Sequence, residues 1–455
     1  MQPRNVDLQA FLDEQRFSRY QWLILAICFL IVAVDGLDTA AMGFVAPSLI
    51  AEWGVTRAEL APVMGAALFG LAIGALTAGP LADKYGRKRI ILISVMIFGI
   101  GGILCSLSWS LPSLTGFRFL TGLGLGAAMP NTVTLVSEYT PASQRNRLST
   151  LMFCGFSLGS AVSAFVAALI IPVFGWRSLL LVGGVLPVIL AIIALFVIPE
   201  SARFLVVKGA PAAKIATILR KIAPSRDWNG VTFSLPEQAT SQAASSIRAL
   251  FINNNTVGTL LLWGTYFMGL LIAYLLTGWL PLLIKDMGIP SDQAAMLTGM
   301  FMFGSTFGTV FMGWLMDRFN RYLVVAIGYV AAGICVLGIA SHGTNVEMLR
   351  VLIFVTGFAM GANLSMVVLS AQFYKTQCRA TGVSWMLGIG RFGGILGASI
   401  GGVLMSVGWD FQMIISSLAV PAILAAAMIG AKGLYYSKVK PESDDSKELV
   451  TTVAH

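Results

Sequence analysis

The sequence predicts an all-α membrane protein in which twelve transmembrane helices form two pseudo-symmetric six-helix halves. Of the 455 residues, 57% are hydrophobic and only 11% are charged, whereas about a quarter of the residues of a soluble domain are charged. Twelve apolar stretches have the length of roughly 20 residues that a bilayer-spanning helix requires. They run over residues 22–50, 60–81, 89–108, 111–136, 148–174, 178–198, 257–284, 292–316, 322–341, 346–370, 379–407 and 411–433.

The chain also repeats itself, because a shift of 234 residues superimposes many of its glycine, proline and charged positions. The superimposed pairs are Pro47 and Pro281, Gly54 and Gly288, Gly79 and Gly313, Asp83 and Asp317, Arg145 and Arg379, Gly159 and Gly393, and Pro187 and Pro421. Two parallel halves of this kind predict a binding site between them near the membrane midplane. Access to that site alternates between the two sides as one half rocks against the other.

Charge placement gives the expected domains and orientation. The domains are an N-terminal tail 1–20, a first half 21–198, a linker 199–256, a second half 257–433 and a C-terminal tail 434–455. Most lysines and arginines fall in the tails, the linker and the loops on the same side, which predicts that both termini are cytoplasmic. The linker is rich in Lys, Arg, Ser and Ala, and we expect it to have little order. The net charge of +9 therefore reflects topology, and we expect no nucleic-acid partner.

Two aspartates, Asp35 and Asp38, lie in the middle of the first apolar stretch and on one helical face. A carboxylate at this depth costs at least about 2.5–3.5 kcal/mol, so such residues usually line a water-filled path or a proton relay. Neighbouring carboxylates in a poorly solvated site do not both stay ionised, so we expect one to carry a proton near neutral pH. The alternatives are a helix cap at a kink near Gly36 or a pairing with a buried arginine.

Arg391 lies deep in the eleventh stretch, among five glycines between Gly388 and Gly397. A guanidinium stays protonated and presents a planar fork that suits a carboxylate. The glycines leave room for a flat ring beside it, so we interpret Arg391 as a clamp for an anionic substrate. The alternative is a permanent pairing with Asp35 or Asp38.

The loop between the second and third stretches predicts a cytoplasmic gate. Gly79 and Gly86 permit a tight turn. Asp83 is expected near the start of the third span, where it stabilises the helix dipole or pairs with a neighbouring arginine. The residues that we assign to the gate are Gly79, Asp83, Gly86, Arg87, Asp317 and Arg379. The alternative is that these charges serve only to set the topology.

Several of these segments resemble the major facilitator superfamily and, within it, the aromatic acid:proton symporter family. The broader likeness lies in the run Gly79–Lys88, the repeated halves and Pro199–Leu205. The narrower likeness lies in Asp35–Pro47 (DGLDTAAMGFVAP), Arg118–Gly126 and Gly382–Gly394 (GVSWMLGIGRFGG), and the first and last of these look closest to 4-hydroxybenzoate and protocatechuate transporters. The resemblance covers the chain outside its tails and implies a symporter of the bacterial inner membrane that imports aromatic carboxylates with protons.

The resemblance also implies site residues. It associates Arg118 with proton coupling, and Glu138 at the end of the same stretch is its expected partner, with a purely structural pair as the alternative. The expected proton-coupling residues are Asp35, Asp38, Arg118 and Glu138. Gly122 and Gly126 have a spacing that allows tight helix packing. Aromatic side chains are expected to contact the substrate ring, and two asparagines its hydroxyl group. The expected substrate-binding residues are Arg391, Phe44, Asn131, Tyr266, Tyr274, Asn363, Trp385 and Phe392.

The expected partners are a small aromatic carboxylate, protons and the lipid bilayer, and we expect a monomer without cofactor or metal. An enzyme is disfavoured because the sequence contains no evident nucleophile–base set. A permease for another small organic anion, or for sugars and polyols, remains the alternative. Against polyols, the stretch Val257–Ile284 offers no Gln or Asn for hydroxyl-rich cargo. Against a drug antiporter, Gly155–Gly159 contains no proline.

Overall fold

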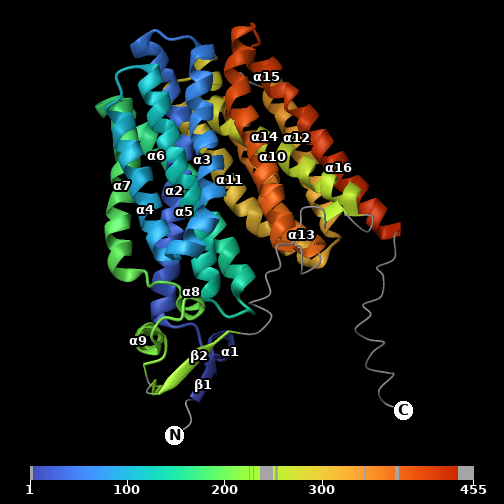
Figure 1. Ribbon diagram of the computed structural model, residues 1–455. Helices are drawn as coiled ribbons and strands as arrows, with labels where there is room; N and C mark the ends of the chain where they lie inside the picture. Colours follow the sequence, from blue (N-terminus) through green and yellow to red (C-terminus); the bar gives the residue numbers. More distant parts are fainter. Residues whose placement is uncertain are drawn as a thin grey trace.

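The structure of the protein is a computed structural model that describes residues 4–224, 226–228, 230–235, 250–251, 255–342, 345–374 and 379–438. Among these residues, twelve spans are long and apolar enough to cross a membrane, as predicted. The first six are α2 (Arg19–Trp53), α3 (Arg57–Tyr85), α4 (Arg87–Ser106), α5 (Leu111–Glu138), α6 (Arg145–Phe174) and α7 (Trp176–Val197). The others are α10 (Asn255–Asp286), α11 (Ser291–Arg318), α12 (Arg321–Ser341), α13 (Val346–Phe373), α14 (Arg379–Ser406) and a last span of α15 (Phe411–Ser417) and α16 (Ala419–Lys438). Figure 1 shows the long helices gathered into a bundle.

Local sequence signals decide where the spans begin and end. At the start of α2, the Ser18 hydroxyl accepts a hydrogen bond from the Gln21 N–H, and the Gln21 side chain accepts one from the Ser18 N–H. This capping box satisfies donors that a helix start leaves unpaired. The end of α2 is Gly54, whose φ of 64° is left-handed, and glycine adopts that conformation without a steric cost. Gly86, with a φ of 101°, separates α3 from α4 in the same manner.

Glycines bring helix backbones together at equivalent places in the two halves of the chain. A Cβ on Gly159 of α6 would overlap the carbonyl group of Ala33 on α2. A Cβ on Gly393 of α14 would overlap the carbonyl group of Phe267 on α10. Both members of the second contact lie 234 residues after those of the first, so the sequence repeat corresponds to a repeated packing contact. Small residues permit such close approach in membranes.

The predicted close packing at Gly122 and Gly126 is also confirmed. A Cβ on either glycine of α5 would overlap the α3 backbone, at Ala67 and Leu71 respectively. This contact fixes α5 against α3 and thereby positions Arg118, one turn earlier on α5.

A small lobe, formed by residues 4–14 and the described part of 202–234, lies at one end of the first six spans (Figure 1). It contains β1 (Arg4–Asp7), α1 (Leu8–Glu14), α8 (Ala202–Val207), α9 (Ala212–Ile222) and β2 (Val231–Ser234). The two strands pair in parallel, with Arg4 opposite Val231. Phe11 of α1 packs edge-on against Trp228, with 5.1 Å between the ring centroids.

The lobe corrects the expectation of little order in the linker, which is wrong for α8, α9 and β2. The reason is that α9 carries buried side chains at helical spacing, among them Ile215, Leu219 and Ile222. An apolar stripe of this kind must be covered, and α2, α8 and β2 pack against α9. The domain boundaries around the linker remain our proposal.

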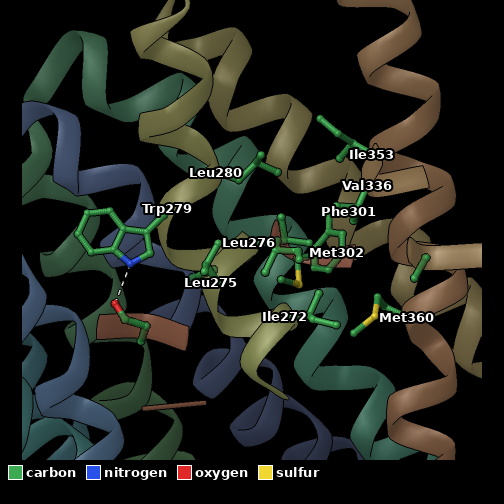
Figure 2. Packing of buried hydrophobic residues seen from close by; sticks show 14 of the residues in the cluster. Ile272, Leu275, Leu276, Trp279, Leu280, Phe301, Met302, Val336, Ile353 and Met360 are labelled. Carbon is green, nitrogen blue, oxygen red and sulfur yellow. Dashed lines mark hydrogen bonds between the residues drawn. The ribbon is translucent and has the colours of Figure 1, made fainter. Parts of the chain in front are cut away.

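The first and second six spans meet towards the end of the bundle away from the lobe, which we call the far end. There Arg57 Nη2 donates to Asp286 Oδ2 at 2.7 Å, and Gly43 of α2 lies against the carbonyl group of Thr277 on α10. Close by, the indole N–H of Trp279 donates to the Ala398 carbonyl at 2.7 Å, as Figure 2 shows beside the apolar core around α10. A polar handle and a large apolar ring together fix the α10–α14 contact.

Candidate functional site

A buried ion pair joins α2 to α5. Arg118 Nη1 donates to both carboxylate oxygens of Asp38, at 2.9 and 2.8 Å, and the two side chains are 3% and 1% exposed. The expected pairing of Arg118 with Glu138 is wrong. Twenty residues separate them on α5, which is about 30 Å along a helix, and Glu138 instead lies 3.6 Å from Arg87.

Asp35 lies one helical turn from this pair and has a different environment. Its side chain is 4% exposed, and Thr39 Oγ1 donates to its Oδ1 at 3.4 Å. It forms no ion pair with any residue that the structure describes, although the charges of Asp38 and Arg391 act on it. The hydrogen bonds of the two carboxyl groups go to Thr39 and Arg118 and none goes to a backbone N–H near Gly36, so capping by either aspartate is not found among the described residues.

Arg391 extends from α14 towards the first half of the chain. Its Nη1 donates to the Leu71 carbonyl on α3 at 3.5 Å. Within the described part of the chain it has no carboxylate within 4.0 Å, so a permanent pairing with Asp35 or Asp38 is not found. Arg118 pairs with Asp38, whereas the Arg391 guanidinium has no acidic partner among the described residues.

The glycines around Arg391 differ in the space beside them: a Cβ on Gly388 would meet nothing within 4 Å. A Cβ on Gly390 would overlap the Tyr266 ring, and a Cβ on Gly394 would press on the Tyr274 ring. Beside Gly390 and Gly394, the room that we expected for a ligand ring is therefore occupied by two tyrosines of α10. These two glycines thus place both phenol rings against the segment of α14 that carries Arg391.

A cavity of about 30 Å³ lies between the two halves at this level. Its lining residues are Thr39, Met42, Gly43, Met64, Ala67, Leu68, Leu71, Arg118, Leu125, Tyr274, Thr277, Gly278 and Ala398. It has room for a water molecule or two, whereas a cavity of roughly 150 Å³ accepts benzene. An aromatic ring would enter only after the halves had moved apart. We call this cavity, with Asp35, Asp38, Arg118 and Arg391 around it, the central chamber.

The other aromatic residues expected to bind the substrate form two groups, of which the first is Tyr274 and Tyr266 and the second is Phe44, Trp385 and Phe392. Tyr274 lines the chamber, and the Tyr266 ring packs against Gly390. Phe44 is buried in the apolar core. Trp385 stacks on Trp263, with centroids 6.0 Å apart, and Phe392 is 57% exposed. Neither Trp385 nor Phe392 lines the chamber.

Both asparagines have internal partners. The Asn131 amide donates to the Ala127 carbonyl of its own helix at 2.8 Å. Asn363 Oδ1 accepts a hydrogen bond of 3.1 Å from the Tyr329 hydroxyl. Sequence reasoning missed Tyr329, together with the chamber residues Thr39 and Thr277. Thr39 had a visible signal, since it lies one turn after Asp35 and can reach that carboxyl group.

The expected gate residues lie at the lobe end of the bundle. Asp83 pairs with Arg87 at 2.6 Å, as the sequence suggested, but it belongs to the last turn of α3 and not to the start of the next span. A Cβ on Gly86 would meet the Glu200 carboxylate, and the φ of 101° at this turn favours glycine. Gly79 has no such close neighbour within the described residues.

In the second half, Asp317 is exposed and forms no ion pair with another described residue. The side chain of Arg379 lies outside the part of the chain that the structure describes.

Comparison with known proteins identifies the family. The family model described as Major Facilitator Superfamily matches residues 28–297 and 262–452, which together cover most of the chain. The chain belongs to the Major Facilitator Superfamily. This superfamily member is therefore a multi-pass membrane transporter and not an enzyme.

Its relatives are transporters as well. This facilitator is 50% identical over 430 residues to the 4-hydroxybenzoate transporter PcaK of Pseudomonas aeruginosa, a match that covers 94% of this chain and 96% of the relative. It is 45% identical over 429 residues to a gallate transporter of Pseudomonas putida, covering 94% and 95%. The crystal structure of a D-xylose-proton symporter matches with a TM-score of 0.69 at 19% identity and covers 90% of this chain and 97% of that one. That last likeness bears on the fold alone.

Proposed function

We propose that this protein is a proton-coupled symporter that imports an aromatic carboxylate, with 4-hydroxybenzoate and protocatechuate as the first candidates. Half of its residues are identical to those of transporters named for 4-hydroxybenzoate, and a gallate transporter is nearly as similar. We further propose that it lies in a bacterial inner membrane with the lobe in the cytoplasm. The placement of lysines and arginines supports that orientation.

The observation that carries this proposal is the charge balance of the central chamber. The Asp38 carboxylate and the Arg118 guanidinium neutralise each other. Asp35 and Arg391 are the remaining charged groups among the chamber residues, and they form no direct ion pair. When Asp35 is ionised the chamber is neutral, and when Asp35 is protonated the chamber carries one positive charge. A protonated chamber therefore attracts a carboxylate anion, and binding of the proton favours binding of the substrate.

A transport cycle follows from this balance. Asp35 takes up a proton from the outside, and the substrate carboxylate then binds Arg391, which is free to accept it. The halves rock, and the chamber opens at the lobe end, where the lower proton concentration removes the proton and the substrate leaves. One proton with a monoanion moves no net charge, so the pH gradient alone drives this cycle. Each further proton would add about 2.3 kcal/mol per 100 mV.

The contacts between the halves support alternating access. The Arg57–Asp286 ion pair and the Gly43–Thr277 contact join the halves at the far end. Arg391 bridges them near the middle through Leu71. In the proposed cycle these contacts break when the far end opens. The chamber then widens, and the Tyr266 and Tyr274 rings become the walls against which the substrate ring packs.

Uptake into proteoliposomes tests the proposal. Purified protein is reconstituted with a basic interior, and uptake of radiolabelled 4-hydroxybenzoate is followed with and without a protonophore. We expect accumulation that the protonophore abolishes and that protocatechuate and gallate inhibit by competition. If the protonophore does not reduce uptake, proton coupling is excluded. Competition by glucose or xylitol, with none by benzoates, would favour the polyol alternative.

Replacement of Asp83 by Asn tests the proposed gate. The Asp83 carboxylate is 70% exposed and its ion pair with Arg87 crosses one turn, so its loss changes folding stability by at most about 1 kcal/mol. We expect the maximal uptake rate to fall several-fold, with a less than twofold change in the substrate concentration for half-maximal uptake. A loss of apparent affinity at an unchanged maximal rate would contradict a role in gating.

A further inference from the structure

A second and larger cavity lies apart from the central chamber, where the lobe meets the ends of α4 and α7. Its volume is about 800 Å³. Figure 1 shows α8 and α9 below the end of α7, and the cavity lies between these elements. The transport cycle proposed above makes no use of it.

Positive charge dominates the walls of this cavity. Six cationic side chains line it, namely Lys84, Lys88, Arg89, Lys208, Lys214 and Lys221, against a single carboxylate, that of Glu200. Glu200 Oε1 already accepts from the backbone N–H groups of Lys88, at 3.1 Å, and Ser201, at 2.9 Å. Among the described residues, none of the six cations has a carboxylate within 4.0 Å. The cavity therefore holds an excess of positive charge that the protein does not neutralise there.

The lysine ammonium groups are held in place without being neutralised. Lys221 Nζ lies 5.2 Å from the centre of the Tyr20 ring, and Lys208 Nζ lies 5.8 Å from that of Phe204. Lys88 Nζ donates to the Leu195 carbonyl at 2.7 Å. Aromatic faces and carbonyl oxygens orient an ammonium group but leave its full charge available to an anion.

The same cavity continues into an apolar surface. Leu92, Leu195 and Phe196 line it, and Phe196 is 77% exposed. Along α7 the exposed side of the helix continues with Ile189, Ile192 and Ile193. On a span of this length and hydropathy, exposed aliphatic side chains face the acyl chains of the bilayer. The cavity thus has a cationic rim and an apolar side that opens towards lipid.

We propose that this cavity binds an anionic phospholipid, with the phosphate headgroup among the six cations and the acyl chains along α4 and α7. Basic pockets at the cytoplasmic side of membrane spans bind anionic lipid headgroups. A soluble phosphate would satisfy the cations as well, but it would leave Leu195 and Phe196 uncovered. The cationic rim and the apolar side of the cavity together favour a phospholipid over a soluble phosphate.

Native mass spectrometry of the full-length protein tests this site. The protein in detergent is titrated with phosphatidylglycerol and, separately, with phosphatidylcholine of the same acyl chains. The test variant combines Lys208→Gln, Lys214→Gln and Lys221→Gln, which are exposed positions on the cavity rim. The control variant combines Arg16→Gln, Arg220→Gln and Arg321→Gln, which are exposed and remove the same charge without lining the cavity.

We expect phosphatidylglycerol to bind the wild-type protein at least tenfold more tightly than phosphatidylcholine. The test variant should lose about a hundredfold in affinity for phosphatidylglycerol, and the control variant less than threefold. If the test variant is not monodisperse, the single change Lys214→Gln replaces it, with an expected loss of about fivefold. Equal affinities in wild type and test variant would overturn the proposal. Displacement of phosphatidylglycerol by millimolar glycerol 3-phosphate would overturn it too, because the ligand would then be a soluble anion.

Discussion

Replacement of Asp35 by Asn is expected to abolish accumulation of 4-hydroxybenzoate against its concentration gradient. Asparagine has nearly the same shape and can still accept a hydrogen bond from Thr39, but it carries no titratable proton. With one proton per substrate, a gradient of one pH unit supports about tenfold accumulation, and in the variant this ratio should fall to one. The measurement is uptake into proteoliposomes under an imposed pH gradient, paired with exchange of labelled for unlabelled substrate at equal pH. Exchange should persist in the variant.

Asp38→Asn provides the contrasting variant. It leaves the Arg118 guanidinium buried without a counter-charge, and breaking a buried ion pair from one side costs about 3–5 kcal/mol. We therefore expect Asp38→Asn to lose accumulation together with a lower melting temperature and a poor yield of folded protein. Asp35→Asn should melt within a few degrees of the wild-type protein. Uphill uptake by Asp35→Asn at the wild-type level would exclude this residue as the proton carrier.

The second large effect is expected from Arg391→Ala, which should weaken binding of 4-hydroxybenzoate by at least about thirtyfold. Loss of one partner of a buried, hydrogen-bonded charge pair costs about 2–5 kcal/mol, and each 1.4 kcal/mol is a factor of about ten. The protein should still fold, because the one hydrogen bond of Arg391 that is lost, to the Leu71 carbonyl, is long at 3.5 Å. Titration calorimetry on purified protein measures the affinity.

Two further variants make this test specific. Arg391→Lys retains the charge but loses the planar fork, so we expect an affinity between those of wild type and Arg391→Ala. Arg350→Ala removes an arginine of α13 that is 47% exposed and pairs with Glu347, and it should leave the affinity unchanged. An unchanged affinity in Arg391→Ala would exclude the clamp.

The fold could be predicted from the sequence because it depends on two properties that can be read without coordinates, the length of the apolar stretches and the internal repeat. Span number depends on apolar length, and the repeat is visible because Gly159 and Gly393 make the same backbone contact in both halves. The intramembrane charges of Asp35, Asp38 and Arg391 could be recognised for the same reason, since each is costly in an apolar stretch.

The pairing of those charges could not be predicted. The spans are apolar around most of their circumference, so the sequence does not reveal which face of α5 meets α2. The partner of Arg118 was therefore chosen from its own helix, whereas the true partner, Asp38, is 80 residues away. The lobe was missed because its signals are short, with two four-residue strands and one eleven-residue amphipathic helix inside a polar segment.

The pairing of β1 with β2 also constrains the order of events during biosynthesis. The strand that begins at Arg4 leaves the ribosome first, yet its neighbour ends at Ser234, beyond the sixth span. Until then the first strand has unsatisfied edge groups and no sheet to join. This two-stranded sheet can therefore form only after the first six spans have been synthesised. An affinity tag that displaces residues 4–7 would prevent the sheet from forming.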